Sequence, residues 1–446
     1  MITLKQDQLG RWSVPGLIEL DPATSQVSLE RSNFPAAAEQ IFFGRGLGKK
    51  QVSAAISKIP SGVLVMVGAS SSKTPSIQGL VASIFQSAAK AHIFTVQGHA
   101  DHKTIRAGIE ALQHIQADHV IVIGGGTTLD VGKAVAGLAR QESGSAVAPF
   151  QTGERTIDPD KALPWIAVPT TSGTGSESTN NAVVEFGEEK RSIRNIPPPS
   201  LIIADPSFTD SLPLSSTIVS LVDAVAQSLE VITHAKATPE IQAVALAAFL
   251  NLAQGLQALV ENTKKTPTPA GIEISTPIRD LLSWGSLLMG IAFAHAGLGL
   301  PHALVHFCQK FNLSHGQMVG ILLVPGLEVQ ALHDPATALR LARVEQALAS
   351  VEQENPLTLD YGADDDNGAD PLTPRADQLF NWLEEAIRKV FVQAGLPTSL
   401  SQAKLGFANL DWLVTKEHAL GASFGIPKRQ ATKDELLAVL KQAWNR

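Results

Sequence analysis

Residues that commonly bind divalent cations recur at helical spacing in the second half of the chain. Asp223 and Gln227 are four residues apart and would share one face of a helix. His302 and His306 have the same spacing, and His315 follows thirteen residues after His302. A single histidine is more often structural, but an aspartate with two histidines from different helices is a suitable ligand set for a divalent cation. Three histidines within fourteen residues therefore favour a metal site.

Three consecutive glycines stand between an apolar run at 119–123 and a helical pattern at 127–140. Glycines at such a junction let backbone N–H groups approach a phosphate, and the helix N-terminus adds favourable partial charge. The pattern is not GxGxxG followed by an acidic residue, so a standard Rossmann site is not indicated. An ordinary tight turn, with Lys133 as a surface lysine, is the alternative. The candidate cofactor-binding residues here are Gly124, Gly125, Gly126, Thr127, Asp130 and Lys133.

Two further turns follow apolar runs and are rich in hydroxyl groups. The loop 169–177 holds five hydroxyls and two glycines, which suit a pyrophosphate or a ribose, although such clusters are also ordinary loop material. The turn 68–73 offers hydroxyls and a cation where an acidic residue would favour NAD, so it predicts a preference for NADPH. An ordinary capped helix start is the alternative there. The candidate residues are Thr170, Thr171, Thr174, Ser70, Ser71 and Lys73.

Strands and helices alternate in the first half of the chain. Apolar runs predict strands at 62–68, 91–97, 119–123, 165–169 and 201–204, and helical periodicity predicts helices at 76–90, 104–116 and 127–140. Strand–helix alternation is typical of an open, mostly parallel sheet with helices on both faces. We therefore predict an α/β dinucleotide-binding domain at 1–207.

Helical patterns dominate after residue 207. They cover 215–232, 239–260, 277–298, 302–311, 378–394, 410–420 and 433–444. We therefore predict an all-α metal and substrate domain at 208–446, with His302 and His306 on one of its helices. Two polar inserts, 263–276 and 353–375, are expected to be exposed loops.

Composition excludes several classes of protein. The chain has 446 residues, 44% of them hydrophobic and 17% charged, enough for a large core. A net charge of −7 disfavours nucleic acid as a partner, and a lone cysteine cannot form an internal disulfide or a zinc ribbon. The segment 281–300 has the length of a membrane span, but its serines, histidine and glycines favour a buried helix. With no apolar signal segment at the start, we expect a cytoplasmic protein without a membrane partner.

Four motifs, in this order, resemble those of the group III, iron-containing alcohol dehydrogenase family. The family patterns GGGSxxDxxK, PTTxGTGSE, DAxxHxxE and AFxNAxLGxxHAxAH…PHG are matched at 124–133, 169–177, 223–230 and 292–316. An opening turn at 42–46 and a C-terminal stretch from 427–429 through the last helix add to the resemblance. The resemblance implies a dehydroquinate-synthase-like architecture. Separately, we expect that the chain can form a homodimer.

The resemblance also assigns roles to the histidine cluster. It implies that Asp223, His302 and His315 bind the metal and that His306 relays protons without binding it. Gln227 stands where the family has a further metal histidine. Because an amide oxygen is a poorer donor than imidazole to Fe²⁺ or Zn²⁺, we expect the metal to be weakly bound or absent.

The activity that the resemblance implies is NAD(P)-dependent interconversion of a small alcohol and an aldehyde or ketone. Hydride transfer would be assisted by a divalent metal that polarises the carbonyl. Three alternatives are a metal-free reductase of an activated carbonyl, similar to maleylacetate reductases, an enzyme of phosphorylated substrates, and a nucleotide-binding descendant without turnover. The phosphate alternative needs cationic residues near the site, where the sequence offers Lys310 alone.

Overall fold

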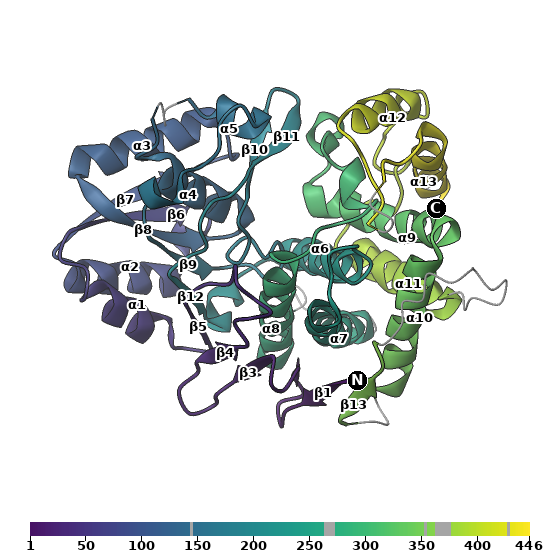
Figure 1. Cartoon of the computed structure of the whole chain (residues 1–446), viewed down its shortest axis with the longest axis horizontal. Coiled ribbons are helices and arrows are strands. Elements are labelled where there is room, and N and C mark those ends of the chain that lie inside the picture. Colours follow the sequence, from purple (N-terminus) through teal and green to yellow (C-terminus); the bar gives the residue numbers. More distant parts are fainter. Residues whose placement is uncertain (143–145, 263–272, 352–354, 362–375, 426–428) are drawn as a thin grey trace. The chain divides into compact units, whose positions relative to one another are not determined.

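The chain forms two compact units. The structure, a computed structural model, describes residues 1–142, 146–262, 273–351, 355–361, 376–425 and 429–446 (Figure 1). The α/β unit comprises Leu20–Leu212, and the helical unit comprises Met1–Glu19 together with Pro213–Arg446. Most of the predicted loops 263–276 and 353–375, and part of the C-terminal motif at 427–429, lie outside the described residues.

A six-stranded parallel sheet is the centre of the α/β unit. Its order is β5-β12-β9-β8-β6-β7, and each neighbouring pair is parallel. The strands are β5 (Gln40–Phe43), β6 (Gly62–Gly68), β7 (Lys90–Val96), β8 (Ala117–Gly124), β9 (Trp165–Pro169) and β12 (Leu201–Ala204). All residues of β6 and β9 are buried, as in strands that are covered on both faces. The predicted open parallel sheet is confirmed.

Helices cover both faces of this sheet. They are α1 (Gly48–Ile56), α2 (Pro75–Ser87), α3 (His102–Ile115) and α4 (Gly126–Leu138). Val63, Val65 and Val67 of β6 belong to a core shared with α1 and α2. Met66 instead lies against α3, where a Cβ added to Gly108 would be 3.3 Å from its Cε. Successive residues of β6 therefore serve opposite faces, with α1 and α2 on one side and α3 and α4 on the other (Figure 1).

The direction of strand addition reverses beside β6. The chain passes from β6 through α2 to β7, and then returns through α3 to β8 on the other side of β6. In open α/β sheets, ligands bind beyond the carboxyl ends of the strands at such a switch point. The topology therefore places the turns that follow β6 and β8, at 68–73 and 124–126, where a ligand is expected.

Several short elements of this unit were not predicted. β10 (Ala182–Phe186) and β11 (Glu189–Ile193) form an antiparallel hairpin. The others are β4 (Val27–Leu29), η1 (Ser71–Lys73), α5 (Ala148–Thr152), η2 (Pro159–Lys161) and η3 (Pro206–Thr209). The edge strand β5 was also missed, because it has four residues and buries only two of them.

Eight α-helices make up most of the described helical unit. They are α6 (Leu214–Ile232), α7 (Pro239–Asn262), α8 (Thr276–Phe293), α9 (His315–His333), α10 (Pro335–Ser350), α11 (Asp377–Gln393), α12 (Asn409–Ala419) and α13 (Lys433–Asn445). Six of them confirm predicted helices to within a few residues, although α8 ends five residues before 298. α9 and α10 were not predicted. α9 contains Pro325 and is buried around most of its circumference, so it has no amphipathic pattern.

The predicted helix at 302–311 is wrong. The segment forms two 3₁₀ turns, η4 (His302–Leu304) and η5 (Cys308–Phe311), because Val305 leaves the helical region at φ −116° and Asn312 is left-handed. His302 and His306 therefore do not share the face of one helix.

The first nineteen residues belong to the helical unit, whereas the predicted domain 1–207 included them in the α/β part. β1 (Ile2–Gln6) pairs with β2 (Trp12–Ser13) and with β13 (Leu357–Leu359) in a small antiparallel sheet. Asn251 of α7 bonds both the N–H and the carbonyl of Trp12, at 2.9 and 3.0 Å, and Trp284 of α8 donates to the same carbonyl at 2.8 Å. These buried bonds tie the N-terminal segment to the helices. A further strand, β3 (Ile18–Leu20), crosses the boundary between the two units, which falls after Glu19.

In the part of the chain that the structure describes, two helices are long and apolar enough to cross a membrane. They are α6 and the 239–261 part of α7, and 78% and 83% of their most apolar windows are buried in the structure. The segment 281–300 lies partly in α8, whose apolar side chains are also mostly buried. All three therefore have the burial of core helices.

Candidate functional site

The glycine turn after β8 is closely packed against the hydroxyl-rich loop after β9. β8 ends at Gly124, Gly125 precedes α4 without a side-chain cap, and Thr127 is exposed in the first turn. A Cβ added to Gly125 would lie 3.0 Å from Thr171, and one added to Gly126 would lie 2.7 Å from Thr174. The two predicted cofactor loops are thus brought together at an uncapped helix N-terminus, where backbone N–H groups can bind an anion.

The turn after β6 contacts the hydroxyl-rich loop that follows β9. The Ser71 and Thr170 hydroxyls are 3.0 Å apart, and the Thr170 N–H donates to the carbonyl of Gly124 at 3.0 Å. Ser70 and Lys73 are exposed on this turn. The structure therefore gathers the carboxyl ends of β6, β8 and β9 at the switch point of the sheet.

Lys133 is fully buried, with 0% of the residue exposed. Its ammonium donates to the Ser176 carbonyl at 2.8 Å and the Thr179 hydroxyl at 2.9 Å, and pairs with Asp130 at 3.2 Å. Asp130 in turn accepts from the Ser176 hydroxyl at 2.6 Å and from the Val183 N–H at 3.1 Å. This burial does not agree with the predicted contact between Lys133 and a phosphate. The Lys133–Asp130 ion pair instead stabilises the loop 169–179 through its bonds to Ser176 and Thr179.

Glu177 is a buried carboxyl beside Lys133, with only 4% of the residue exposed. Burial raises the pKa of Glu177 to about 7, although its own backbone N–H and the charge of Lys133 act in the opposite direction. Burial also lowers the pKa of Lys133, against the charge of Asp130. The base of the loop therefore contains a carboxyl that holds its proton to a higher pH than in the unfolded chain.

We expect the stability of Glu177→Gln to overtake that of the wild type as pH rises. Between about pH 4.5 and 7 the folded wild type holds a proton on Glu177 that the unfolded chain has released, so its unfolding free energy falls with pH by at most about 1.4 kcal/mol per unit. The amide does not titrate, and Lys133 and Asp130 are present in both proteins. Urea unfolding at pH 5 to 8 should show the difference growing and then levelling above pH 7. A pH-independent difference would contradict the raised pKa.

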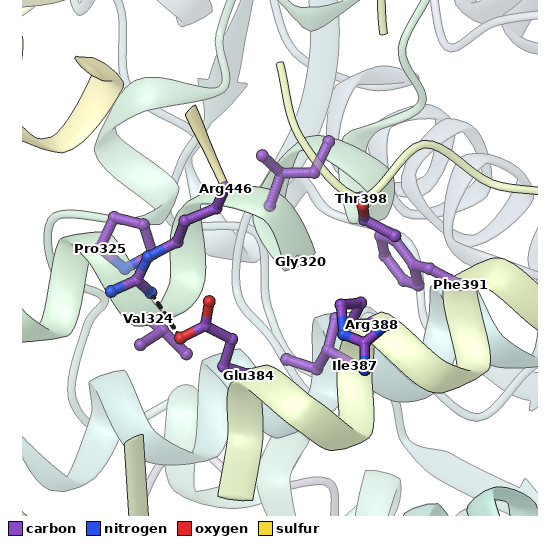
Figure 2. Close-up of a pocket in the computed structure, with 10 residues that line it drawn as sticks. Gly320, Val324, Pro325, Glu384, Ile387, Arg388, Phe391, Thr398 and Arg446 are labelled. Atoms are coloured by element: carbon purple, nitrogen blue, oxygen red, sulfur yellow. Dashed lines mark ion pairs between the residues drawn. The ribbon is translucent and has the colours of Figure 1, made fainter. Parts of the chain in front are cut away.

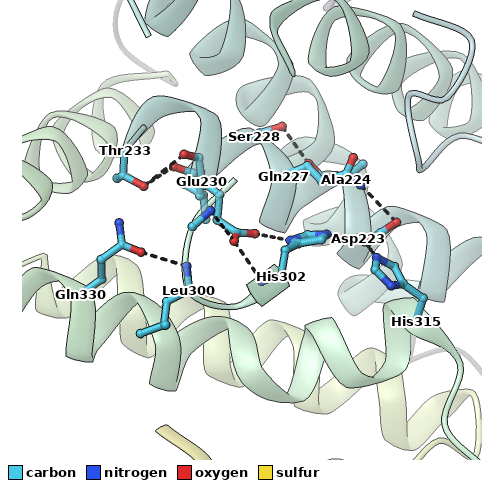
Figure 3. A network of polar contacts seen from close by, with 12 residues as sticks. Asp223, Ala224, Gln227, Ser228, Glu230, Thr233, Leu300, His302, His315 and Gln330 are labelled. Atoms are coloured by element: carbon cyan, nitrogen blue, oxygen red, sulfur yellow. Dashed lines mark hydrogen bonds and ion pairs between the residues drawn. The ribbon is translucent and has the colours of Figure 1, made fainter. Parts of the chain in front are cut away.

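The predicted metal ligands are brought together in the helical unit. Oδ1 of Asp223, on α6, is 3.2 Å from Nε2 of His302 and 3.6 Å from Nε2 of His315 (Figure 3). One ligand atom from each of these three residues lies within 4.8 Å of the others. Asp223 and His302 are buried and His315 is half-buried. His315 is the first residue of α9, so three separate elements supply the cluster.

Gln227 lies on the same side of α6 as Asp223 and has an orphaned polar atom. Its Nε2 donates to Oδ2 of Asp223 at 3.4 Å. Its Oε1 is buried and has no hydrogen-bond partner among the described residues. Leaving a buried carbonyl oxygen without a partner costs about 1 to 3 kcal/mol, so Gln227 has an unused oxygen donor on the side chain that contacts Asp223. Two imidazoles and a carboxylate, with this amide in contact with the carboxylate, fit a divalent cation.

Glu230 orients the His302 ring through a bond to Nδ1, the ring nitrogen that does not face Asp223. Its carboxylate bonds Nδ1 of His302, and its other oxygen accepts the backbone N–H groups of Gly299 at 3.0 Å and His302 at 3.1 Å. Burial lowers the pKa of His302, but the charge of Glu230 and the hydrogen bonds to Asp223 and Glu230 outweigh it and raise the pKa to about 10. A carboxylate on Nδ1 leaves Nε2 facing Asp223, which is the usual way in which proteins fix a ligating imidazole.

His306 is held by a different carboxylate and is not one of the three clustered residues. Its Nδ1 is 2.8 Å from Oε2 of Glu417, and its backbone N–H donates to Oε1 of Glu417 at 2.9 Å. Burial raises the pKa of Glu417, and the hydrogen bonds and charge of His306 oppose this shift.

A separate pocket of the helical unit lies between α9, α11 and the C-terminus (Figure 2). Arg446 and Glu384 form an ion pair of 3.4 Å at its rim, and Phe391 and Pro325 contribute apolar surface. None of the predicted site residues lines it. We therefore assign it no part in the site.

Sequence reasoning missed the residues that support the site. Glu230 is seven residues after Asp223 on α6, so its helical spacing could have marked it. Glu177 is the last residue of the loop 169–177, whose hydroxyls and glycines alone suggest a role. Glu417 is 111 residues from His306, and no local signal connects the two.

Comparisons with known proteins match both halves of the chain to one family. A family model described as iron-containing alcohol dehydrogenase matches residues 38–206. A second, described as the C-terminal part of the Fe-containing alcohol dehydrogenase family, matches residues 217–364. Together the two matches contain the glycine turn, the hydroxyl-rich loop and the histidine cluster.

Curated relatives align over part of their length. Long-chain-alcohol dehydrogenase 1 of Geobacillus thermodenitrificans is 34% identical over 208 residues, which cover 46% of this chain and 50% of that protein. 1-Propanol dehydrogenase PduQ of Citrobacter freundii is 32% identical over 248 residues, which cover 55% and 60% respectively. The chain thus spans about half the length of the first curated relatives that it matches.

Solved structures share the fold over nearly the whole chain. A 1,3-propanediol oxidoreductase superposes with a TM-score of 0.74 at 21% identity, covering 92% of this chain and 98% of that one. An alcohol dehydrogenase from Oenococcus oeni gives 0.72 at 22% identity, with 92% and 99% covered. At these identities the likeness concerns the fold alone.

Proposed function

This chain belongs to the iron-containing alcohol dehydrogenase family, and from that membership we propose that it is an NAD(P)-dependent oxidoreductase. It would interconvert a small alcohol and an aldehyde or ketone by hydride transfer. The observation that carries the proposal is the cluster of Asp223, His302 and His315, with Gln227 in contact with its carboxylate. That cluster suits a cation next to a reacting oxygen, and the glycine turn suits a dinucleotide.

The metal would be held by the two imidazole Nε2 atoms, the Asp223 carboxylate and the Gln227 amide oxygen. When bound, such a cation acts as a Lewis acid on a carbonyl or alkoxide oxygen. Glu230 keeps the His302 ring in the orientation that ligation needs, through the bond to Nδ1. His306 would pass the proton between the alcohol and solvent as a general acid and base.

The cofactor would lie at the switch point of the sheet. The uncapped N-terminus of α4 and the packed loop around Thr171 and Thr174 support pyrophosphate binding there. Ser71, exposed Ser70 and the Lys73 cation support binding of a 2′-phosphate. We therefore propose NADPH as the preferred form.

Gln227 favours a second candidate, a metal-free reductase of an activated carbonyl. An amide in place of imidazole weakens the site for Fe²⁺ and Zn²⁺. Without a cation, the electrophilic help would have to come from a histidine that donates a hydrogen bond to the carbonyl oxygen.

An assay of the purified chain separates these candidates. NADPH and NADH oxidation would be followed with a panel of aldehydes and ketones, before and after chelator treatment, with elemental analysis of each sample. We expect aldehyde-dependent oxidation, faster with NADPH, that falls after chelation and returns with Fe²⁺ or Zn²⁺. Activity that survives complete metal removal would support the metal-free reductase. Nucleotide binding without oxidation of either cofactor would support a descendant without turnover, and a tenfold preference for NADH would contradict the role given to Ser70, Ser71 and Lys73.

A further inference from the structure

A buried carboxylate on α12 holds His306 by two bonds. Glu417 is 0% exposed, and each of its two oxygens bonds His306. Oε1 accepts the His306 backbone N–H at 2.9 Å, and Oε2 lies 2.8 Å from Nδ1 of the ring. The His306 side chain itself is 35% exposed, so the ring remains reachable while its Nδ1 edge is fixed.

Helix α12 also packs against residues 307–311, which follow His306 in the chain. Trp412 of α12 makes edge-to-face contacts with Phe307 and Phe311, with ring centroids 5.3 and 6.1 Å apart. The Lys310 ammonium lies 4.7 Å from the Trp412 ring. Since 305–307 has no regular structure of its own, α12 supplies the contacts that determine how His306 is presented.

The bonding pattern decides which ring nitrogen carries the hydrogen. An ionised carboxylate can only accept hydrogen bonds, so Nδ1 must be the donor in this pair. A neutral His306 then has Nε2 as its unprotonated nitrogen, the one that can take up a proton. We propose that Glu417 is a positioning residue that sets the tautomer of His306 and so directs proton transfer to Nε2. The proposal rests on the proposed dehydrogenase function, in which His306 moves a proton.

Glu417→Gln should reverse this tautomer with little change in shape. The amide has one accepting oxygen and one donating NH₂ group, whereas the carboxylate accepts at both ends. The backbone N–H of His306 can only donate, so it should take the amide oxygen. The NH₂ group then faces Nδ1, which must lose its hydrogen, and the proton moves to Nε2.

The test combines nitrogen NMR with kinetics. In ¹⁵N-histidine-labelled protein, with the His306 signals assigned by their loss in His306→Ala, the wild type should show Nδ1–H and Glu417→Gln should show Nε2–H. The kcat of Glu417→Gln should fall about 100-fold or more, with KM for the cofactor unchanged. Glu417→Asp, which keeps the carboxylate, should keep the wild-type tautomer and recover part of kcat.

A matched control is Glu345→Gln, because Glu345 also accepts a backbone N–H, that of Leu379 at 2.8 Å. It should change neither the His306 signals nor kcat. An Nε2–H tautomer in the wild type, an unchanged tautomer in a folded Glu417→Gln protein, or a reversed tautomer with unchanged kcat would each overturn the proposal. A wild type that is inactive but has the expected tautomers would instead contradict the proposed function, while still confirming that Glu417 controls His306.

Discussion

Gln227→His should bind Fe²⁺ or Zn²⁺ about ten- to a hundred-fold more tightly than the wild type. Substituting residues that only hydrogen-bond to metal ligands already changes metal affinity by about ten- to a hundred-fold, so replacing a ligand itself should have at least this effect. Position 227 is buried beside Asp223 on α6, where its amide lies 3.4 Å from the carboxylate. Imidazole at this position would replace a weak oxygen donor with a nitrogen donor that suits both metals.

Competition with a chromophoric chelator, followed by elemental analysis, would measure this gain without any activity assay. Gln227→Leu, which offers no donor, should bind less metal than the wild type, and His302→Ala should remove what remains. If the wild type holds a full equivalent of iron or zinc after prolonged dialysis against chelator, then Gln227 does not weaken the site.

Gly125→Val should lose measurable affinity for NADPH and NADH, a decrease of at least about 100-fold. The added Cβ would lie 3.0 Å from the methyl carbon of Thr171, so the hydroxyl-rich loop must move. The two further methyl groups would occupy space above the uncapped N-terminus of α4, where a phosphate needs close approach. Displacement of the loop and steric obstruction of the phosphate position would both lower the affinity for the cofactor.

Isothermal titration with each cofactor would measure the effect. Gly406→Val is a suitable control, because Gly406 is exposed in the other unit and its added Cβ would meet only Asn409, at 3.4 Å. The control should bind both cofactors normally. Unchanged affinity in a folded Gly125→Val protein would show that the cofactor pyrophosphate does not lie at this turn.

The sequence predicted best the features that depend on neighbouring residues. The apolar run 62–68 is a fully buried strand, and the glycines at 124–126 follow the strand and begin the helix as expected. The clustering of Asp223 with two histidines also followed from spacing and from the family motifs. The strand and turn signals are local, whereas Asp223 and His302 are 79 residues apart, so the order of the family motifs was needed to connect them.

Features that depend on burial by distant segments could not be predicted in the same way. Lys133 has the spacing of a phosphate-binding lysine, yet it is enclosed by the loop 176–179. α9 is apolar around most of its circumference, so its periodicity is lost. The helix expected at 302–311 follows its apolar pattern, but the chain breaks at Val305 and packs His306 against Glu417 instead.

The discontinuous helical unit has a consequence for the order of events on the ribosome. Thr3 of β1 bonds Thr358 of β13, which is synthesised 355 residues later. At translation rates of about 5 to 20 residues per second, that delay is roughly 20 to 70 s. The α/β unit, continuous from Leu20 to Leu212, can fold completely during this interval. The nascent chain would therefore have its glycine turn in place while β1, which can already pair with β2, still lacks its second partner strand β13.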